Sequence, residues 1–122
     1  MTLTTDATPA LLAAEGWVPV CRLSRLTPDR GVAALVERRP VAVFRLSDGD
    51  LHVLDNVDPA SGASVLSQGL VGDVDGTPTV ASPMFKHRFD LRTGAGLDTP
   101  GTAVKVHEST LVDGVVHVRL VP

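Results

Sequence analysis

Residues 80–94 read VASPMFKHRFDLRTG and form the most informative local pattern in this chain of 122 residues. Short β-branched and aromatic runs flank a proline-containing interruption at Ser82–Lys86. This pattern predicts two strands, Thr77–Ala81 and His87–Leu91, joined at a tip. The Thr93-Gly94 pair that follows is typical of a turn. This part of the chain therefore predicts β-structure.

Two Asp-Gly pairs, Asp48-Gly49 and Asp113-Gly114, each lie between two apolar runs. Asp-Gly tolerates the positive φ of a type I′ turn, so we expect both pairs to close β-hairpins. The expected strands are Val41–Leu46 and Leu51–Leu54 around the first pair, and Val104–Val112 and Val115–Leu120 around the second.

The remaining segments complete an all-β interpretation. Trp17–Leu23 and Val32–Val36 are expected as strands, with a turn at residues 38–40. Residues 56–76 contain repeated glycines and are expected to form one long loop. The prediction is one antiparallel β-sandwich or partly open barrel over residues 15–122, preceded by a tail or short helix over residues 1–14.

The composition excludes several classes of function. Apolar residues make up 43% of the chain, charged residues 20%, and the net charge is −3. No basic face for nucleic acid is indicated, and no apolar run reaches the roughly 18 residues of a membrane span. No signal peptide is recognisable, and the single Cys21 allows no intrachain disulfide. We therefore expect a cytoplasmic protein with an inert, buried Cys21, and the Ala, Val, Arg, Gly and Asp bias suggests a GC-rich bacterial genome.

Two separated motifs resemble the Rieske family, namely LDNVDP at residues 54–59 and the 80–94 sequence with its FDLRTG ending. Pro100-Gly101 matches the proline-containing loop that follows in that family. The resemblance extends from about Trp17 to Leu120 and implies a Rieske-like fold. It also implies two loops that carry cluster ligands, which lie here at residues 55–64 (the first loop) and 82–88 (the second loop).

The ligand positions depart from the Rieske pattern. The family places Cys-x-His in the first loop and Cys-x-x-His in the second, and the aligned residues here are Asn56, Asp58, Ser82 and Phe85. A Rieske centre requires two thiolates and two imidazoles. We therefore expect no iron–sulfur cluster in this chain. Asn56, Asp58 and Ser82 are expected to hold the two loops together by hydrogen bonds instead, and Phe85 is expected to pack within the domain.

This departure resembles one branch of the family, the small subunit of the assimilatory NAD(P)H-dependent nitrite reductase. That resemblance implies a non-catalytic subunit of an enzyme that reduces nitrite to ammonium. It implies a large subunit as partner, with FAD, sirohaem, a [4Fe–4S] cluster and the NAD(P)H site all on that subunit. We expect docking through the tips of both loops, residues 55–64 and 82–88. The candidate docking residues lie in the second loop and are Met84, Phe85, Lys86, His87 and Arg88.

No catalytic or metal-binding set is recognisable in the chain itself. Ser82 has no plausible neighbouring base, and an oxygen site built from Asn56, Asp58 and Ser82 is too weak for most divalent ions. His107 and His117 flank the Asp113-Gly114 turn and are expected to face solvent, too few for a metal site.

Two other functions remain open from the residues alone. One is a Rieske-type ferredoxin that carries electrons with atypical ligands, and the other is a stand-alone interaction module on the same fold.

Overall fold

In the computed structural model, which describes residues 9–122, nine β-strands are accompanied by one short α-helix and two 3₁₀ helices. Residues 1–8 of the expected N-terminal segment lie outside the described residues. The division of the chain at residue 15 stays a prediction. The elements are α1 (Pro9–Ala14), β1 (Val18–Arg22), η2 (Leu23–Arg25), β2 (Arg30–Val36), β3 (Arg39–Arg45), β4 (Leu51–Asp55), η3 (Leu66–Gln68), β5 (Leu70–Val74), β6 (Thr77–Ala81), β7 (Arg88–Asp90), β8 (Val106–Val112) and β9 (Val115–Arg119).

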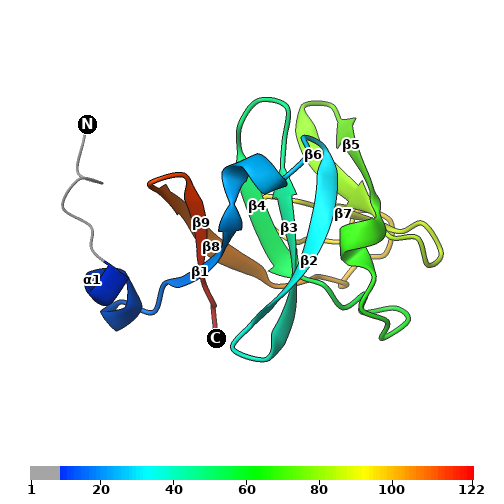
Figure 1. Ribbon diagram of the computed structural model, residues 1–122. Helices are drawn as coiled ribbons and strands as arrows, with labels where there is room; N and C mark the ends of the chain where they lie inside the picture. The colour runs from blue at the N-terminus through cyan, green and yellow to red at the C-terminus, as the bar shows by residue number, and fades with distance from the viewer. Residues whose placement is uncertain (1–8) are drawn as a thin grey trace.

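The strands form two antiparallel sheets. The larger sheet has the order β1-β9-β8-β4-β3-β2, and its two edge strands β1 and β2 contact each other, so the sheet curls towards a closed barrel. The smaller sheet has the order β5-β6-β7. It lies at the right of Figure 1, and α1 with the β8–β9 hairpin lies at the left. The predicted all-β, antiparallel architecture is confirmed.

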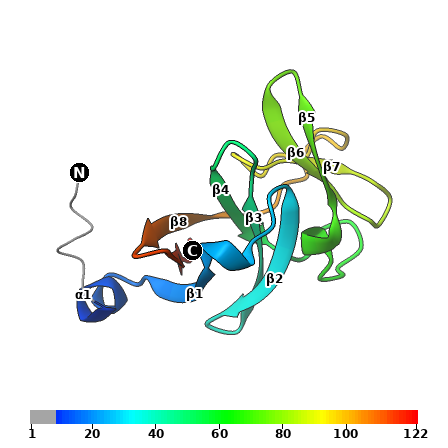
Figure 2. The same ribbon diagram turned by 45° about the horizontal axis from the view of Figure 1, so that its top comes forward.

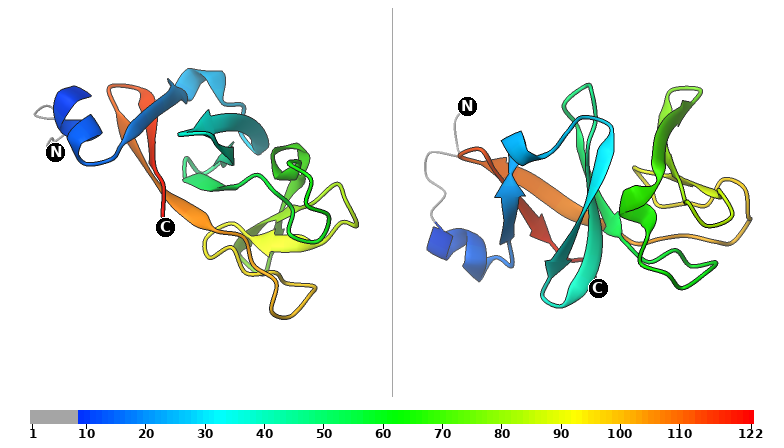
Figure 3. Two further views of the ribbon diagram at one scale, coloured as in Figure 1. Left: turned by 90° about the horizontal axis from the view of Figure 1, so that it is seen from below. Right: turned by 45° about the vertical axis from the view of Figure 1, so that its right-hand side comes forward.

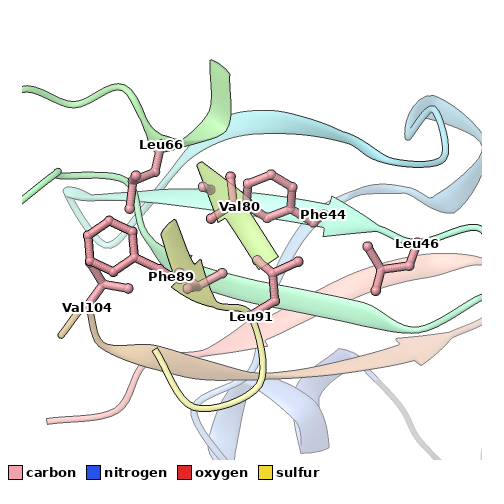
Figure 4. Packing of buried hydrophobic residues seen from close by; sticks show 9 residues of the cluster. Phe44, Leu46, Leu66, Val80, Phe89, Leu91 and Val104 are labelled. Atoms are coloured by element: carbon pink, nitrogen blue, oxygen red, sulfur yellow. The ribbon is translucent and has the colours of Figure 1, made fainter. Parts of the chain in front are cut away.

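Strand β3 lies between two hydrophobic cores. Ala42 and Phe44 pack into the core shared with the three-stranded sheet, while Val41 and Val43 pack inside the curled six-stranded sheet. A strand buried on both faces reads as a continuous apolar run, which is what the sequence shows here. Figure 4 shows the first core, where Phe44 and Leu66 lie beside Val80, Phe89 and Val104.

The turns agree with the predicted hairpins but differ in type. The pairing of β3 with β4 and of β8 with β9 confirms both hairpins. Asp113 and Gly114 both have positive φ, as a type I′ turn requires. At the other hairpin only Gly49 has positive φ, so the type I′ prediction is wrong there. Its turn is closed instead by backbone hydrogen bonds between Leu46 and Asp50 and between Gly49 and Leu46.

Two further hairpin turns differ from the prediction, one in its position and one because it was not expected. Glu37 and Arg38 both have positive φ and join β2 to β3, so the expected turn at residues 38–40 lies too far along the chain. Asp75-Gly76 is a third Asp-Gly turn, again with both φ values positive, and it joins β5 to β6. Residues 56–76 are therefore not one long loop, because η3 and β5 occupy its second half.

No helix within residues 9–122 has the length and apolar character needed to cross a membrane.

Candidate functional site

The two loops expected to carry cluster ligands lie together beside the three-stranded sheet. The first loop leaves β4, and the second loop joins β6 to β7. Figure 3 shows the first loop, in green, on the side of the molecule that carries β5, β6 and β7, and Figure 2 shows this sheet on the side opposite α1.

A buried hydrogen bond joins the two loops. The Ser82 hydroxyl donates to Oδ2 of Asp58 at 2.5 Å, and both residues are almost fully buried, at 1% and 0% exposure. The other Asp58 oxygen accepts the Ala60 N–H at 2.8 Å, and the Ser82 oxygen accepts the Met84 N–H at 3.1 Å. This pair, the Asp58–Ser82 clamp, therefore orders the start of each loop as well as connecting them.

Asn56 organises the first loop from within. Its side-chain oxygen accepts the Ser67 N–H at 2.7 Å, and its amide nitrogen donates to the Ser64 hydroxyl at 2.9 Å. Its backbone oxygen accepts hydrogen bonds from Val65 and Leu66. Because Asn56 is only 3% exposed, these bonds satisfy polar groups that would otherwise be costly to bury.

The second loop presents Phe85 to solvent. Phe85 is 67% exposed, so the expectation that it packs within the domain is wrong. Its φ is 65° and that of Lys86 is 60°, a left-handed conformation that is rare for a bulky residue. The loop is closed beneath them by the Ser82 N–H, which donates to the His87 carbonyl at 2.8 Å. Closure of the loop, rather than burial of the ring, thus determines where Phe85 lies.

The basic residues of the second loop differ in whether their side chains form ion pairs. Two of the three guanidinium nitrogens of Arg88, Nη2 and Nε, donate to the Asp98 carboxylate at 2.7 and 3.1 Å. With a further bond from the Arg88 N–H, they lower the pKa of Asp98 to about 2. Lys86, in contrast, has no hydrogen bond or ion pair to any residue in the described part of the chain. Of the predicted docking residues, Lys86 is therefore the one with an unpaired positive charge.

The four residues at the ligand positions do not fit a [2Fe–2S] cluster. Asn56, Asp58 and Ser82 offer only oxygen and amide groups, and these groups already make hydrogen bonds within the protein. Phe85 has no atom that could bind iron. Cys21 lies on β1, at an edge of the six-stranded sheet, where burial raises the pKa of its thiol and so disfavours the thiolate. Within residues 9–122 no group of three or more His, Cys, Asp or Glu residues is arranged to hold a metal ion.

A partly buried network of polar side chains lies next to the first loop and was not predicted. His107 donates from Nε2 to Asp55 at 2.7 Å, and its Nδ1 accepts the Val121 N–H at 3.0 Å. The Arg39 guanidinium binds both Asp55 oxygens at 2.9 Å. Burial opposes ionisation of Asp55, but the hydrogen bonds from Arg39 and His107 outweigh it and hold the pKa of this carboxyl below its ordinary value. The network anchors the end of β4, from which the first loop starts.

The predicted exposure of two histidines is wrong. His107 is 4% exposed and His117 is 8% exposed. His117 bonds the Val115 carbonyl, and its position opposite Thr110 shows that the two imidazoles are not cross-strand partners. The alternation of apolar and polar residues along β8 and β9 could not reveal this burial. The C-terminal Val121 lies against His107, and α1 lies near His117, so both faces of the hairpin are covered by residues outside it.

Comparison with known proteins gives consistent results. Residues 16–119 match the Rieske-like [2Fe-2S] domain family. The NADH nitrite reductase small subunit of Escherichia coli K12 is 38% identical over 104 residues, covering 84% of this chain and 96% of that protein. A crystal structure of a Mycobacterium tuberculosis chain, assigned as an NADH-dependent nitrite reductase small subunit, superposes with a TM-score of 0.83 at 42% identity, covering 87% of this chain and 96% of that one.

A third relative is a much larger protein. The nitrite reductase [NAD(P)H] large subunit of Klebsiella oxytoca is 37% identical over 107 residues, which cover 88% of this chain but only 11% of that protein. A domain similar to this chain is therefore part of the large-subunit polypeptide in that organism.

Proposed function

Because this chain belongs to the Rieske-like [2Fe-2S] domain family, and to its branch of nitrite reductase small subunits, we propose that it docks to the large subunit of an NAD(P)H-dependent nitrite reductase. In this proposal the large subunit holds FAD, sirohaem, the [4Fe–4S] cluster and the NAD(P)H site and reduces nitrite to ammonium. This chain contributes no catalytic residue. The relative in which a similar domain is part of the large-subunit polypeptide supports a direct association.

The observation that carries the proposal is the exposure of Phe85. An aromatic side chain at 67% exposure buries little surface in this domain, and its left-handed backbone adds a conformational cost. Met84 beside it is 38% exposed. Exposed aromatic side chains held by a rigid base are the usual anchors of protein interfaces. We therefore place the docking surface on the second loop, with Phe85 at its centre and Lys86 as its free cation.

The lack of fit at the ligand positions supports a cluster-free role. With oxygen, amide and phenyl groups at these positions, we propose that the domain keeps the Rieske loops as a docking surface rather than for one-electron transfer. The Asp58–Ser82 clamp then holds the loops where a diiron centre would otherwise do so. We further propose that the complex works in a bacterial cytoplasm.

Variants of Phe85 test the docking surface. Phe85→Ala and Phe85→Gly should each weaken binding to the sirohaem-containing large subunit by about tenfold or more, because an interface anchor is lost. Glycine adopts the left-handed conformation freely, so Phe85→Gly should keep the free energy of unfolding within about 1 kcal/mol of the parent. Isothermal titration calorimetry and urea denaturation measure the two quantities.

Leu111→Ala is the matched control. Leu111 is 39% exposed on β8, close to the β8–β9 turn at the opposite side of the molecule, and its truncation should leave affinity unchanged. If Phe85→Gly bound as tightly as the parent, the second loop would not be the docking surface. If the unaltered chain did not bind the large subunit at all, the proposed function itself would be wrong.

A further inference from the structure

Leu70 is the most exposed large apolar side chain in the described part of the molecule, at 78% exposure. It is the first residue of β5, an edge strand that pairs only with β6. The preceding Gly69 sets its position, because a Cβ there would lie 2.4 Å from the Ala81 carbonyl oxygen and 2.7 Å from Cγ2 of Val80. Leu70 is thus held outward on a backbone that is packed closely against β6.

Leu70 lies on one side of a hollow whose other side is the second loop. The hollow has a volume of about 260 Å³ and is lined mainly by apolar atoms of Leu70, Ala81, Pro83 and the Gln68-Gly69 backbone segment, with Ser82 and Lys86. It is smaller than the roughly 300–1,000 Å³ of a small-molecule site. Its size suits a single side chain.

The walls of this hollow are ordered before any partner arrives. Ser82 is fixed by its hydrogen bond to Asp58, and the second loop is closed by the bond from the Ser82 N–H to His87. Pro83 has a fixed φ and loses little conformational entropy on contact. A preformed surface binds with a small ordering cost, so the hollow can receive an apolar group without rearranging the second loop.

Lys86 gives the hollow its electrostatic character. It is the one charged residue of the lining, and no carboxylate of the described chain pairs with it. The hollow therefore favours an apolar group that has a negative charge next to it. Lys86 directly follows Phe85 in the second loop.

We propose that this hollow receives an apolar side chain of the large subunit that is adjoined by a carboxylate, the apolar group packing on Leu70 and Pro83 and the carboxylate pairing with Lys86. This inference rests on the proposed docking to that subunit. The interface then has two parts. Phe85 inserts into the large subunit, and the hollow beside Leu70, here called the socket, receives the apolar side chain of the large subunit.

The test measures the affinity of full-length variants for the sirohaem-containing large subunit. Leu70→Asp places a charge in the socket and should weaken binding about tenfold or more. Lys86→Met should weaken it by a few fold and should also reduce the dependence of the association rate on salt, because a rim charge mainly steers association. Leu111→Asp introduces the same charge at the far side of the molecule and should bind like the parent; circular dichroism melting curves confirm that each variant is folded.

The outcomes separate the two proposals. If Phe85→Ala weakened binding but Leu70→Asp stayed within about twofold of the parent, the socket would be refuted while docking through the second loop stood. If Leu70→Asp only abolished self-association of the isolated chain in size-exclusion chromatography, the occupant would be a second copy, and the inference would be wrong. If the parent chain showed no affinity for the large subunit, the proposed function would fail, and the socket with it.

Discussion

The hydroxyl of Ser82 makes the side-chain hydrogen bond that connects the two loops, and it does so across 24 residues of sequence. Both residues make a second hydrogen bond, since the other carboxylate oxygen of Asp58 accepts the Ala60 N–H and the Ser82 hydroxyl oxygen accepts the Met84 N–H. Buried polar groups of this kind are most costly when only one partner is removed. The energetic role of the clamp is therefore best measured by single substitutions.

Ser82→Ala should lower the free energy of unfolding by about 1–3 kcal/mol, because it leaves the buried Asp58 oxygen without its donor. Urea denaturation measures the change. Ser24→Ala, at an exposed residue of η2, is the control and should alter stability by less than about 0.5 kcal/mol. Equal stability of the two variants would show that the clamp does not hold the loops.

Among the secondary-structure elements, the turn after β7 has the tightest packing. Gly94 has φ of 80°, and a Cβ on it would lie 1.9 Å from the Val104 carbonyl oxygen. The Val104 N–H in turn donates to the Gly94 carbonyl. This turn brings the chain from the three-stranded sheet back towards β8, so the join between the sheets depends on a residue without a side chain.

Gly94→Ala should cost about 3 kcal/mol or more, the sum of left-handed strain and a backbone clash. Gly101→Ala separates the two effects, because Gly101 has a similar φ of 83° but nothing within 4 Å of the added Cβ. We expect the control to cost about 1–2 kcal/mol. Thermal and urea unfolding of both variants give the difference, and equal losses would mean that the close approach of residues 94 and 104 is unimportant for stability.

At the scale of the whole molecule, two cores share the strand pair β3–β4. Val53 packs inside the curled six-stranded sheet and the adjacent Leu54 packs against the three-stranded sheet. The three-stranded sheet with its loops is therefore mounted on a rigid base. Under the proposed function, packing and hydrogen bonds hold the two loops as a docking surface rather than as a redox site.

The isolated protein should contain neither iron nor acid-labile sulfide and should show no visible absorbance, because no thiolate or imidazole lies at the ligand positions. Iron and sulfide assays after aerobic purification, and again after anaerobic reconstitution, test this, with a cluster-containing Rieske ferredoxin prepared in parallel. Stoichiometric iron and sulfide in the reconstituted chain would instead favour the electron-carrier alternative.

Local sequence was sufficient for those features that depend on near neighbours. The Asp113-Gly114 hairpin follows from backbone conformations that these residues adopt readily, and the β-branched and aromatic run at Val41–Leu46 predicted the strand that is observed as β3. The Asp75-Gly76 turn carried the same signal and could have been found by it. The turn between β2 and β3 was predicted one residue too late, because neither Glu37 nor Arg38 favours positive φ and the pairing of β2 with β3 imposes it.

The properties of the site depended on contacts between distant parts of the chain. Asp58 and Ser82 are ordinary turn residues in sequence, and their bond exists because the two sheets bring their loops together. Phe85 is exposed, and His107 buried, for the same kind of reason. Local backbone preference depends on neighbouring residues, whereas burial and hydrogen-bond partners depend on which surfaces the fold brings into contact, and only the tertiary structure determines those.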